Sequence, residues 1–150
     1  MEMSSNIRRI VTANDDHGRS KVWIDDVAGN VSTSRPGVKG TVVWTTDSIP
    51  PDISGNEDLG ARKVARPPVR RGTILRVIEF QPGNTRDMHS TETIDYALVL
   101  KGEMDMFLDD NQKVHVQEGD VIIQRATLHD WSNRGTEPCV IAFILIDAQA

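Results

Sequence analysis

The chain has 150 residues, of which 38% are hydrophobic and 26% are charged, a composition typical of one folded globular domain. Its formal net charge of −5 disfavours a nucleic-acid partner, because phosphate binding depends on a surplus of Lys and Arg. We find no signal-peptide pattern and no apolar run of the roughly 18–20 residues that span a bilayer. Cys139 is the single cysteine, which excludes an internal disulfide. We therefore expect a cytoplasmic protein that binds neither nucleic acid nor a membrane.

The first half of the sequence contains short apolar patches in a polar setting. Residues 10–11, 21–24 and 40–46 each predict a strand, bounded by Asn, Asp, Gly and Ser. A proline-rich segment, residues 48–72, follows, and proline disfavours a helix there. Its basic side chains are Arg62, Lys63, Arg66, Arg70 and Arg71. We expect a solvated arm, and the alternative is a lid that draws in an anionic substrate.

The second half has a more regular strand pattern. Within residues 103–109, Met104, Met106 and Leu108 alternate with acidic side chains, as in a half-buried strand. The predicted strands of this half are residues 73–81, 93–101, 103–109, 113–117, 121–124 and 139–146. Short strands separated by turns at this spacing indicate an all-β sandwich or barrel. We find no amphipathic helix.

Two of the four histidines begin series of side chains that share one face of a strand. His17 lies in a polar turn and His115 on the polar face of its strand, so both are expected to be solvated. The other two histidines, His89 and His129, each begin a series formed by every second residue. The series after His89 contains Thr91, Thr93 and Asp95, and the series after His129 contains Trp131. A carboxylate on an inward face is costly unless it is paired or binds a cation. Two histidines and one carboxylate form the open-sided ligand set of non-haem iron enzymes, and they suit other divalent metals.

These residues resemble the two sequence motifs of the cupins. Gly83, His89, Asp95 and Gly102 resemble the first motif, and residues 119–133 resemble the second. The resemblance is to small single-domain proteins of the RmlC-like cupin superfamily, of the cupin-2 conserved-barrel type, and it covers about half of the chain. It implies a double-stranded β-helix, or jelly-roll barrel, with an N-terminal strand extension and a Pro-rich arm. The expected single domain is residues 1–150, with the core barrel at about 73–147 and the N-terminal strands and arm at 1–72.

The sequence departs from the cupin motifs at three places. The second histidine of the first motif is Thr91, the usual glutamate is Asp95, and residues 125–127 replace Pro-x-Gly. Typical cupins hold a metal with three histidines and a glutamate, so His89, Asp95 and His129 are the metal ligands that the resemblance implies, for Fe, Mn, Zn or Ni. The alternative is a metal-free pocket in which His129 and His89 act as general acid and base and Asp95 orients one of them. We expect no organic cofactor.

The resemblance implies a small-molecule enzyme, a lyase (decarboxylase or dehydratase), isomerase or dioxygenase acting on a carboxylated or phenolic metabolite. The alternative is a non-catalytic module that binds or senses a small ligand. The expected substrate-binding residues are Trp131, Arg76, Thr91 and Trp44. Cys139 begins an apolar strand and is expected to be a core residue. We also predict a homodimer, because the apolar strands, residues 140–146 above all, would expose more hydrophobic surface than a monomer tolerates.

Overall fold

The computed structural model describes residues 6–65 and 67–149, so Arg66 of the predicted arm lies outside the described residues. The described residues form eleven strands and two short 3₁₀ turns. The strands are β1 (Arg8–Asn14), β2 (Ser20–Val27), β3 (Asn30–Ser32), β4 (Val38–Thr46), β5 (Thr73–Phe80), β6 (Thr93–Lys101), β7 (Glu103–Phe107), β8 (Lys113–Gln117), β9 (Val121–Arg125), β10 (Asp130–Ser132) and β11 (Cys139–Asp147). The turns are η1 (Leu59–Ala61) and η2 (Asp109–Asn111). No helix in the described ranges is long and apolar enough to cross a membrane.

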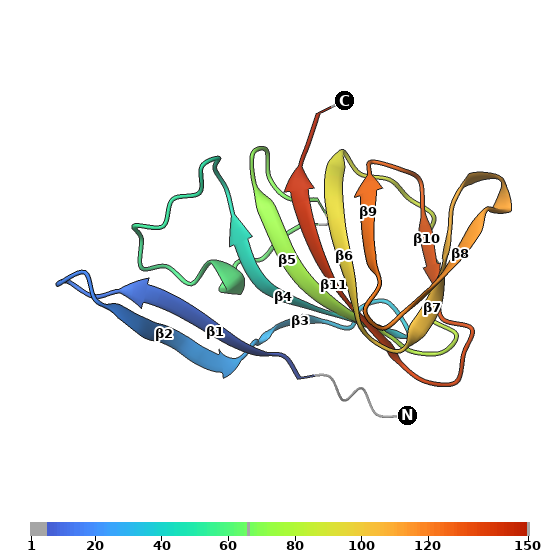
Figure 1. Cartoon of the computed structure of the whole chain (residues 1–150), viewed down its shortest axis with the longest axis horizontal. Helices are drawn as coiled ribbons and strands as arrows, with labels where there is room; N and C mark the ends of the chain where they lie inside the picture. The colour runs from blue at the N-terminus through green and yellow to red at the C-terminus, as the bar shows by residue number, and fades with distance from the viewer. Residues whose placement is uncertain (1–5, 66, 150) are drawn as a thin grey trace.

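Two antiparallel sheets build the barrel. A six-stranded sheet has the order β3-β4-β5-β11-β6-β9, and a three-stranded sheet has the order β10-β7-β8 (Figure 1). Side chains from both sheets form one hydrophobic core, which includes Ile74, Ala97 and Ile141 of the large sheet and Met104 and Met106 of the small one. The crossing of the chain between the sheets gives the predicted all-β, double-stranded β-helix architecture.

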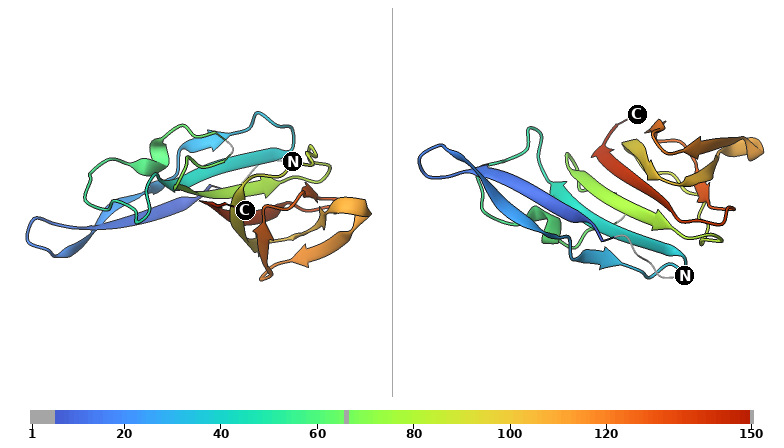
Figure 2. Two further views of the ribbon diagram at one scale, coloured as in Figure 1. Left: turned by 90° about the horizontal axis from the view of Figure 1, so that it is seen from above. Right: turned by 60° about the horizontal axis from the view of Figure 1, so that its bottom comes forward.

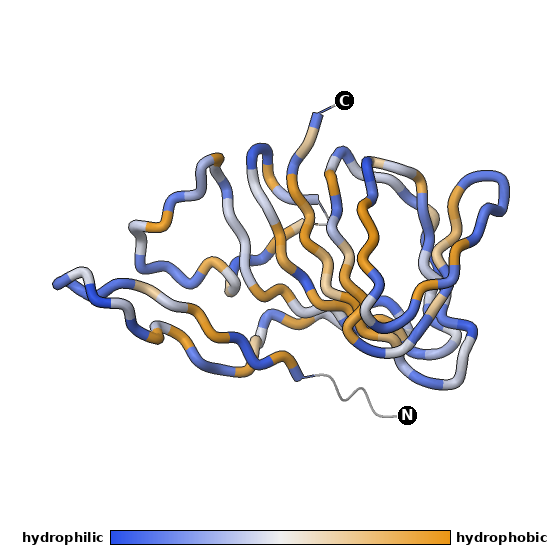
Figure 3. The backbone as a smooth tube through the Cα atoms, in the orientation of Figure 1, coloured by the Kyte–Doolittle hydropathy of each residue, from blue (hydrophilic) through white to orange (hydrophobic). Residues whose placement is uncertain are grey.

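Strand β11 lies in the centre of the six-stranded sheet, between β5 and β6 (Figure 3). Val140, Ile141, Phe143 and Leu145 are buried there, so the reason we gave for a homodimer, an exposed apolar strand at residues 140–146, is wrong. Exposed hydrophobic side chains occur on the N-terminal hairpin, in the 48–72 segment and on the outer face of β6 and β9. Examples are Ile53 in the segment and Tyr96, Val121 and Ile123 on β6 and β9. Burial raises the pKa of the Cys139 thiol to about 12, which agrees with its predicted place in the core.

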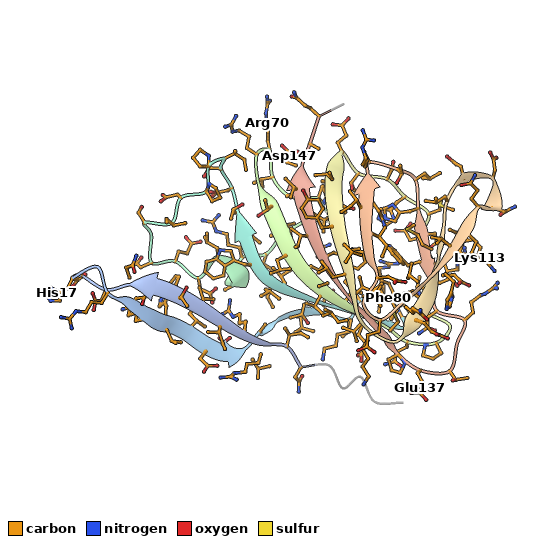
Figure 4. The ribbon with its side chains drawn as sticks, viewed as in Figure 1. His17, Arg70, Phe80, Lys113, Glu137 and Asp147 are labelled. Carbon is orange, nitrogen blue, oxygen red and sulfur yellow. The ribbon has the colours of Figure 1, made fainter. Side chains whose placement is uncertain are left out.

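A two-stranded hairpin, β1–β2, extends beyond the barrel, and His17 lies at its solvated tip (Figures 2 and 4). Its base is joined to the rest of the protein through Arg9, whose guanidinium is buried. Arg9 donates to the carboxylates of Asp26 and Asp58, at distances of 2.6–3.1 Å. Thr45 of β4 also donates its hydroxyl to the Leu59 carbonyl at 2.6 Å. These bonds hold the η1 part of the 48–72 segment against the hairpin and β4.

Candidate functional site

A pocket opens into the barrel beside the small sheet. It is a small, partly open cavity with a volume of about 80 Å³. Strands β5, β6, β10 and β11 and the loop before β6 contribute its wall. The lining residues are Arg35, Arg76, Ile78, Phe80, Asp87, His89, Thr91, Asp95, His129, Asp130, Trp131, Phe143 and Leu145.

His89 and His129 form a pair held by the backbone. Each N–H donates to the carbonyl of the other residue at 3.0 Å, which makes an isolated antiparallel bridge between the loop before β6 and the start of β10. The centroids of the two imidazole rings lie 4.7 Å apart. The two histidines selected by strand parity therefore meet on one wall of the pocket.

The backbone also determines which ring nitrogen of each histidine carries a proton. The Nδ1 atom of His89 lies 2.8 Å from the Asp87 carbonyl oxygen, and the Nδ1 atom of His129 lies 2.8 Å from the Thr127 carbonyl oxygen. A carbonyl oxygen only accepts, so each Nδ1 must donate, and Nε2 of the neutral ring keeps its lone pair. Burial lowers the pKa of His129, so its neutral form, with a basic Nε2, is favoured.

Asp95 is buried on β6 at the end of a chain of hydroxyl groups. Thr93 donates to its Oδ1 atom at 2.6 Å, and the Thr91 hydroxyl lies 2.7 Å from the Thr93 hydroxyl. Since Thr93 uses its proton for Asp95, Thr91 donates to Thr93. Burial raises the pKa of Asp95, against the opposite effects of the Thr93 hydrogen bond and of the charges on His129, His89 and Arg76. The carboxyl group is therefore easier to protonate than an ordinary aspartate.

The three expected metal ligands line one pocket, but they do not fit a three-ligand metal centre. Among the described residues, no group of three His, Cys, Asp or Glu side chains could hold a metal ion. Asp95 directs one carboxylate oxygen to the Thr93 hydroxyl, and a hydroxyl group stands at Thr91 in place of an imidazole. The expectation of a centre built from His89, Asp95 and His129 is therefore corrected to a histidine pair with a separate carboxyl group.

Three of the four expected substrate-binding residues lie in the wall. Thr91 and Arg76 line the pocket, and Trp131 packs against Phe143 and Phe80, with ring centroids 5.6 and 6.4 Å away. Arg76, Ile78 and Phe80 alternate along β5, and all three line the pocket. The aromatic cluster offers a flat apolar surface to a substrate ring.

Trp44 is the exception, because it lies on the other face of the sheet. Its ring packs edge-on against Trp23 of the hairpin, with centroids 5.9 Å apart, and it is not among the described lining residues. A register shift in β4 pairs Val42 with Arg76 but Trp44 with Leu75. Directly opposed residues share a face, so this β-bulge turns Trp44 away from the pocket.

Sequence analysis missed several polar residues of the wall. Asp130 is buried, and its carboxylate accepts from the Asp87 N–H at 3.0 Å and from Arg86 Nε at 2.7 Å. It therefore anchors the loop whose carbonyl orients His89. Arg35 reaches the pocket from the turn before β4. Both lie outside any period-2 pattern, so the sequence offered no signal for them beyond the proximity of Asp130 to His129.

Comparisons with known proteins agree with this fold. The Cupin domain family model matches residues 76–146. The cupin-domain-containing oxidoreductase fogC of Aspergillus ruber is 30% identical over 149 residues, which is 95% of this chain and 73% of that protein. The cupin-domain-containing oxidoreductase srdD of Neurospora crassa is 34% identical over 113 residues, or 72% of this chain and 58% of that protein.

Among solved structures, the polyketide cyclase RemF from Streptomyces resistomycificus has the same fold, with a TM-score of 0.52 and 16% identity over 75% of this chain and 66% of that one. The chain spans 73% of the length of fogC but little more than half of srdD. The two β-sheets, the motif histidines at their junction and the similarity to fogC along nearly the whole sequence agree: the chain belongs to the cupin family.

Proposed function

We propose that this cupin is a small-molecule enzyme that transfers protons on a carboxylated or phenolic metabolite, as a lyase of the dehydratase type or an isomerase. The observation that supports the proposal best is the burial of a histidine and a carboxyl group in one pocket. Burial lowers the pKa of His129 and raises the pKa of Asp95, so it favours the neutral form of each group. A neutral imidazole can accept a proton and a protonated carboxyl group can donate one, as a general base and a general acid do.

In the proposed reaction, Nε2 of His129 accepts a proton from the substrate. The Thr127 carbonyl, 2.8 Å from Nδ1, stabilises the imidazolium that forms. The Asp95 carboxyl group supplies a second proton, to the departing hydroxyl group in a dehydration or to the carbon that gains hydrogen in an isomerisation. The aromatic cluster around Trp131 orients the substrate ring.

The names of the relatives favour an enzyme of small-molecule metabolism. Several are called oxidoreductases, and others, such as the Oryzines biosynthesis cluster protein J of Aspergillus oryzae, are named for biosynthesis clusters. A redox reaction on the same substrate is therefore the second candidate. It ranks second because the described side chains do not supply three ligands for Fe, Mn, Zn or Ni, and we derive no step through a metal.

The test is to incubate the protein in D₂O with a panel of hydroxybenzoates, phenols and aliphatic hydroxy acids and to follow deuterium uptake and water loss by mass spectrometry. We expect turnover of one class and a loss of about 100-fold or more in the His129→Asn variant. His115→Asn, on the outer face of β8, is the matched control and should retain full activity. Full activity of His129→Asn would refute the proposal.

Two other outcomes of the same test select the alternatives. Stoichiometric metal in elemental analysis, with activity lost on chelation, would favour the oxidoreductase. Tight binding of a panel compound without any product would favour a non-catalytic ligand-binding or sensor module.

A further inference from the structure

A second cavity adjoins the pocket across the large sheet. It lies on the face formed by β3, β4 and β5, and residues 63–65 of the Pro-rich segment line it as well. Arg35, Arg76 and Ile78 line both cavities, so the two adjoin at these three residues. We call the second cavity the β4 groove. Its remaining lining residues are Asn30, Val31, Ser32, Thr33, Ser34, Val38, Gly40, Val42, Lys63, Val64 and Ala65.

The lining of the β4 groove combines cations with an apolar floor. Arg35, Lys63 and Arg76 are its charged side chains, and the described lining contains no aspartate or glutamate. This local excess of positive charge occurs in a chain whose formal net charge is −5. Val38 and Val42 of β4, on the same face as Gly40, supply apolar surface. Such a lining complements an elongated molecule that has an apolar body and an anionic group.

The groove is a built feature, because hydrogen bonds fix both of its sides. Asn30 of β3 donates its amide to the carbonyls of Gly60 and Arg62, at 2.9 and 2.7 Å, which holds the Pro-rich segment beside the sheet. Arg76 donates to the Ala65 carbonyl at 3.4 Å across the groove. Arg35 donates to the Thr85 carbonyl at 3.4 Å.

The floor of the groove has an open space at Gly40. Gly40 lies directly opposite Ile78 in the β4–β5 pairing, so a side chain at this position would point to the same face as Ile78. No heavy atom of the described residues lies within 4 Å of the place where its Cβ would be, and its φ is not in the left-handed region. The sequence therefore leaves room where any other residue would fill the groove.

We propose that the β4 groove binds the elongated part of the substrate, and that this substrate is an amphiphilic organic anion. Its anionic group binds Arg35 and Arg76 at the junction, where planar guanidinium groups match a carboxylate, and its apolar chain lies along the valines past Gly40. This inference rests on the proposed function for the identity of the ligand as a substrate. Anion binding itself requires no turnover.

The test is isothermal titration calorimetry with decanoate, decyl phosphate, decanol and decyltrimethylammonium, each below the concentration at which it forms micelles. We expect binding of decanoate that weakens with added salt, and little or no binding of the alcohol or the cation. Arg35→Gln and Arg76→Gln should each weaken decanoate binding about ten-fold. Arg70→Gln, at an exposed position remote from the groove (Figure 4), is the matched control.

Gly40→Leu gives an independent test, because the new side chain enters open space. We expect it to fold with a melting temperature close to that of the parent and to lose decanoate binding about ten-fold or more. Equal affinity for decanoate and decanol, or unchanged affinity in Gly40→Leu and both arginine variants, would overturn the proposal. Tighter binding of decyl phosphate than of decanoate would support the anion site and identify phosphate as the favoured group.

These outcomes separate the groove from the chemistry of the histidine pair. His129→Asn should bind decanoate like the parent, because His129 does not line the β4 groove in the described structure. Loss of turnover without loss of decanoate binding therefore concerns the proposed reaction alone. A dimer that forms only with the arginines intact, and that excludes decanoate, would show that a second copy occupies the groove and would overturn the ligand proposal.

Discussion

Replacing Thr93 with valine should destabilise the protein by an amount that depends on pH. The Thr93 hydroxyl donates to the Asp95 carboxylate at 2.6 Å in the barrel interior, and valine has the same shape without the donor. A hydrogen bond to a charged group contributes about 1.5–3 kcal/mol, and a bond between neutral groups about 0.5–1.5 kcal/mol. Thr93→Val should therefore lower the free energy of unfolding by about 1 kcal/mol more when Asp95 is ionised than when it is protonated.

The direction of this pH dependence follows from the pKa of Asp95. Burial raises the folded-state pKa above the unfolded value, so the folded protein binds more protons between the two values. The contribution of Asp95 to stability is therefore fully present below the unfolded pKa and falls as the pH rises through the folded pKa. The Thr93 hydroxyl favours the carboxylate, so its removal raises the folded pKa further and extends the fall to higher pH.

Urea unfolding of parent and variant from about pH 4 to about pH 8 measures the difference directly. The matched control is Thr45→Val, since the buried Thr45 hydroxyl donates to a neutral acceptor, the Leu59 carbonyl, at 2.6 Å. Its destabilisation should be about 0.5–1.5 kcal/mol at every pH. If the two variants showed the same pH dependence, the Thr93–Asp95 bond would not be the charged interaction that we describe.

Three further variants test other parts of the structure. Gly102→Ala should cost at least about 1–2 kcal/mol in thermal unfolding, because φ is +79° and the Cβ would collide with the Pro138 carbonyl; unchanged stability would contradict this. Arg9→Met should cost about 2 kcal/mol, since Arg9 is buried but its partner Asp58 is partly exposed, and should speed proteolysis of residues 48–72; a resistant segment would refute the anchoring role. Light scattering should give a homodimer that Ile123→Asp dissociates; a monodisperse parent monomer at micromolar concentration would refute the dimer.

The strand pattern of residues 73–147 could be read from the sequence because side chains alternate with a period of two. Alternation in β6 predicts that Thr93 and Asp95 face inward, and both are buried. The same parity brings His89 and His129 to one pocket. These predictions succeed because strand geometry is local, and one residue determines the face of the next along the same strand.

Tertiary structure alone decided the features that depend on how separate strands pair. The bulge in β4 reverses the face of Trp44, and no local pattern marks it. Strand β11 is covered because it inserts between β5 and β6, two strands that lie far before it in the sequence. Packing between elements also brings Arg35 beside Arg76 in the pocket lining and leaves Asp95 outside the histidine pair. Distances of a few ångströms across the barrel are determined by the whole fold and not by local alternation.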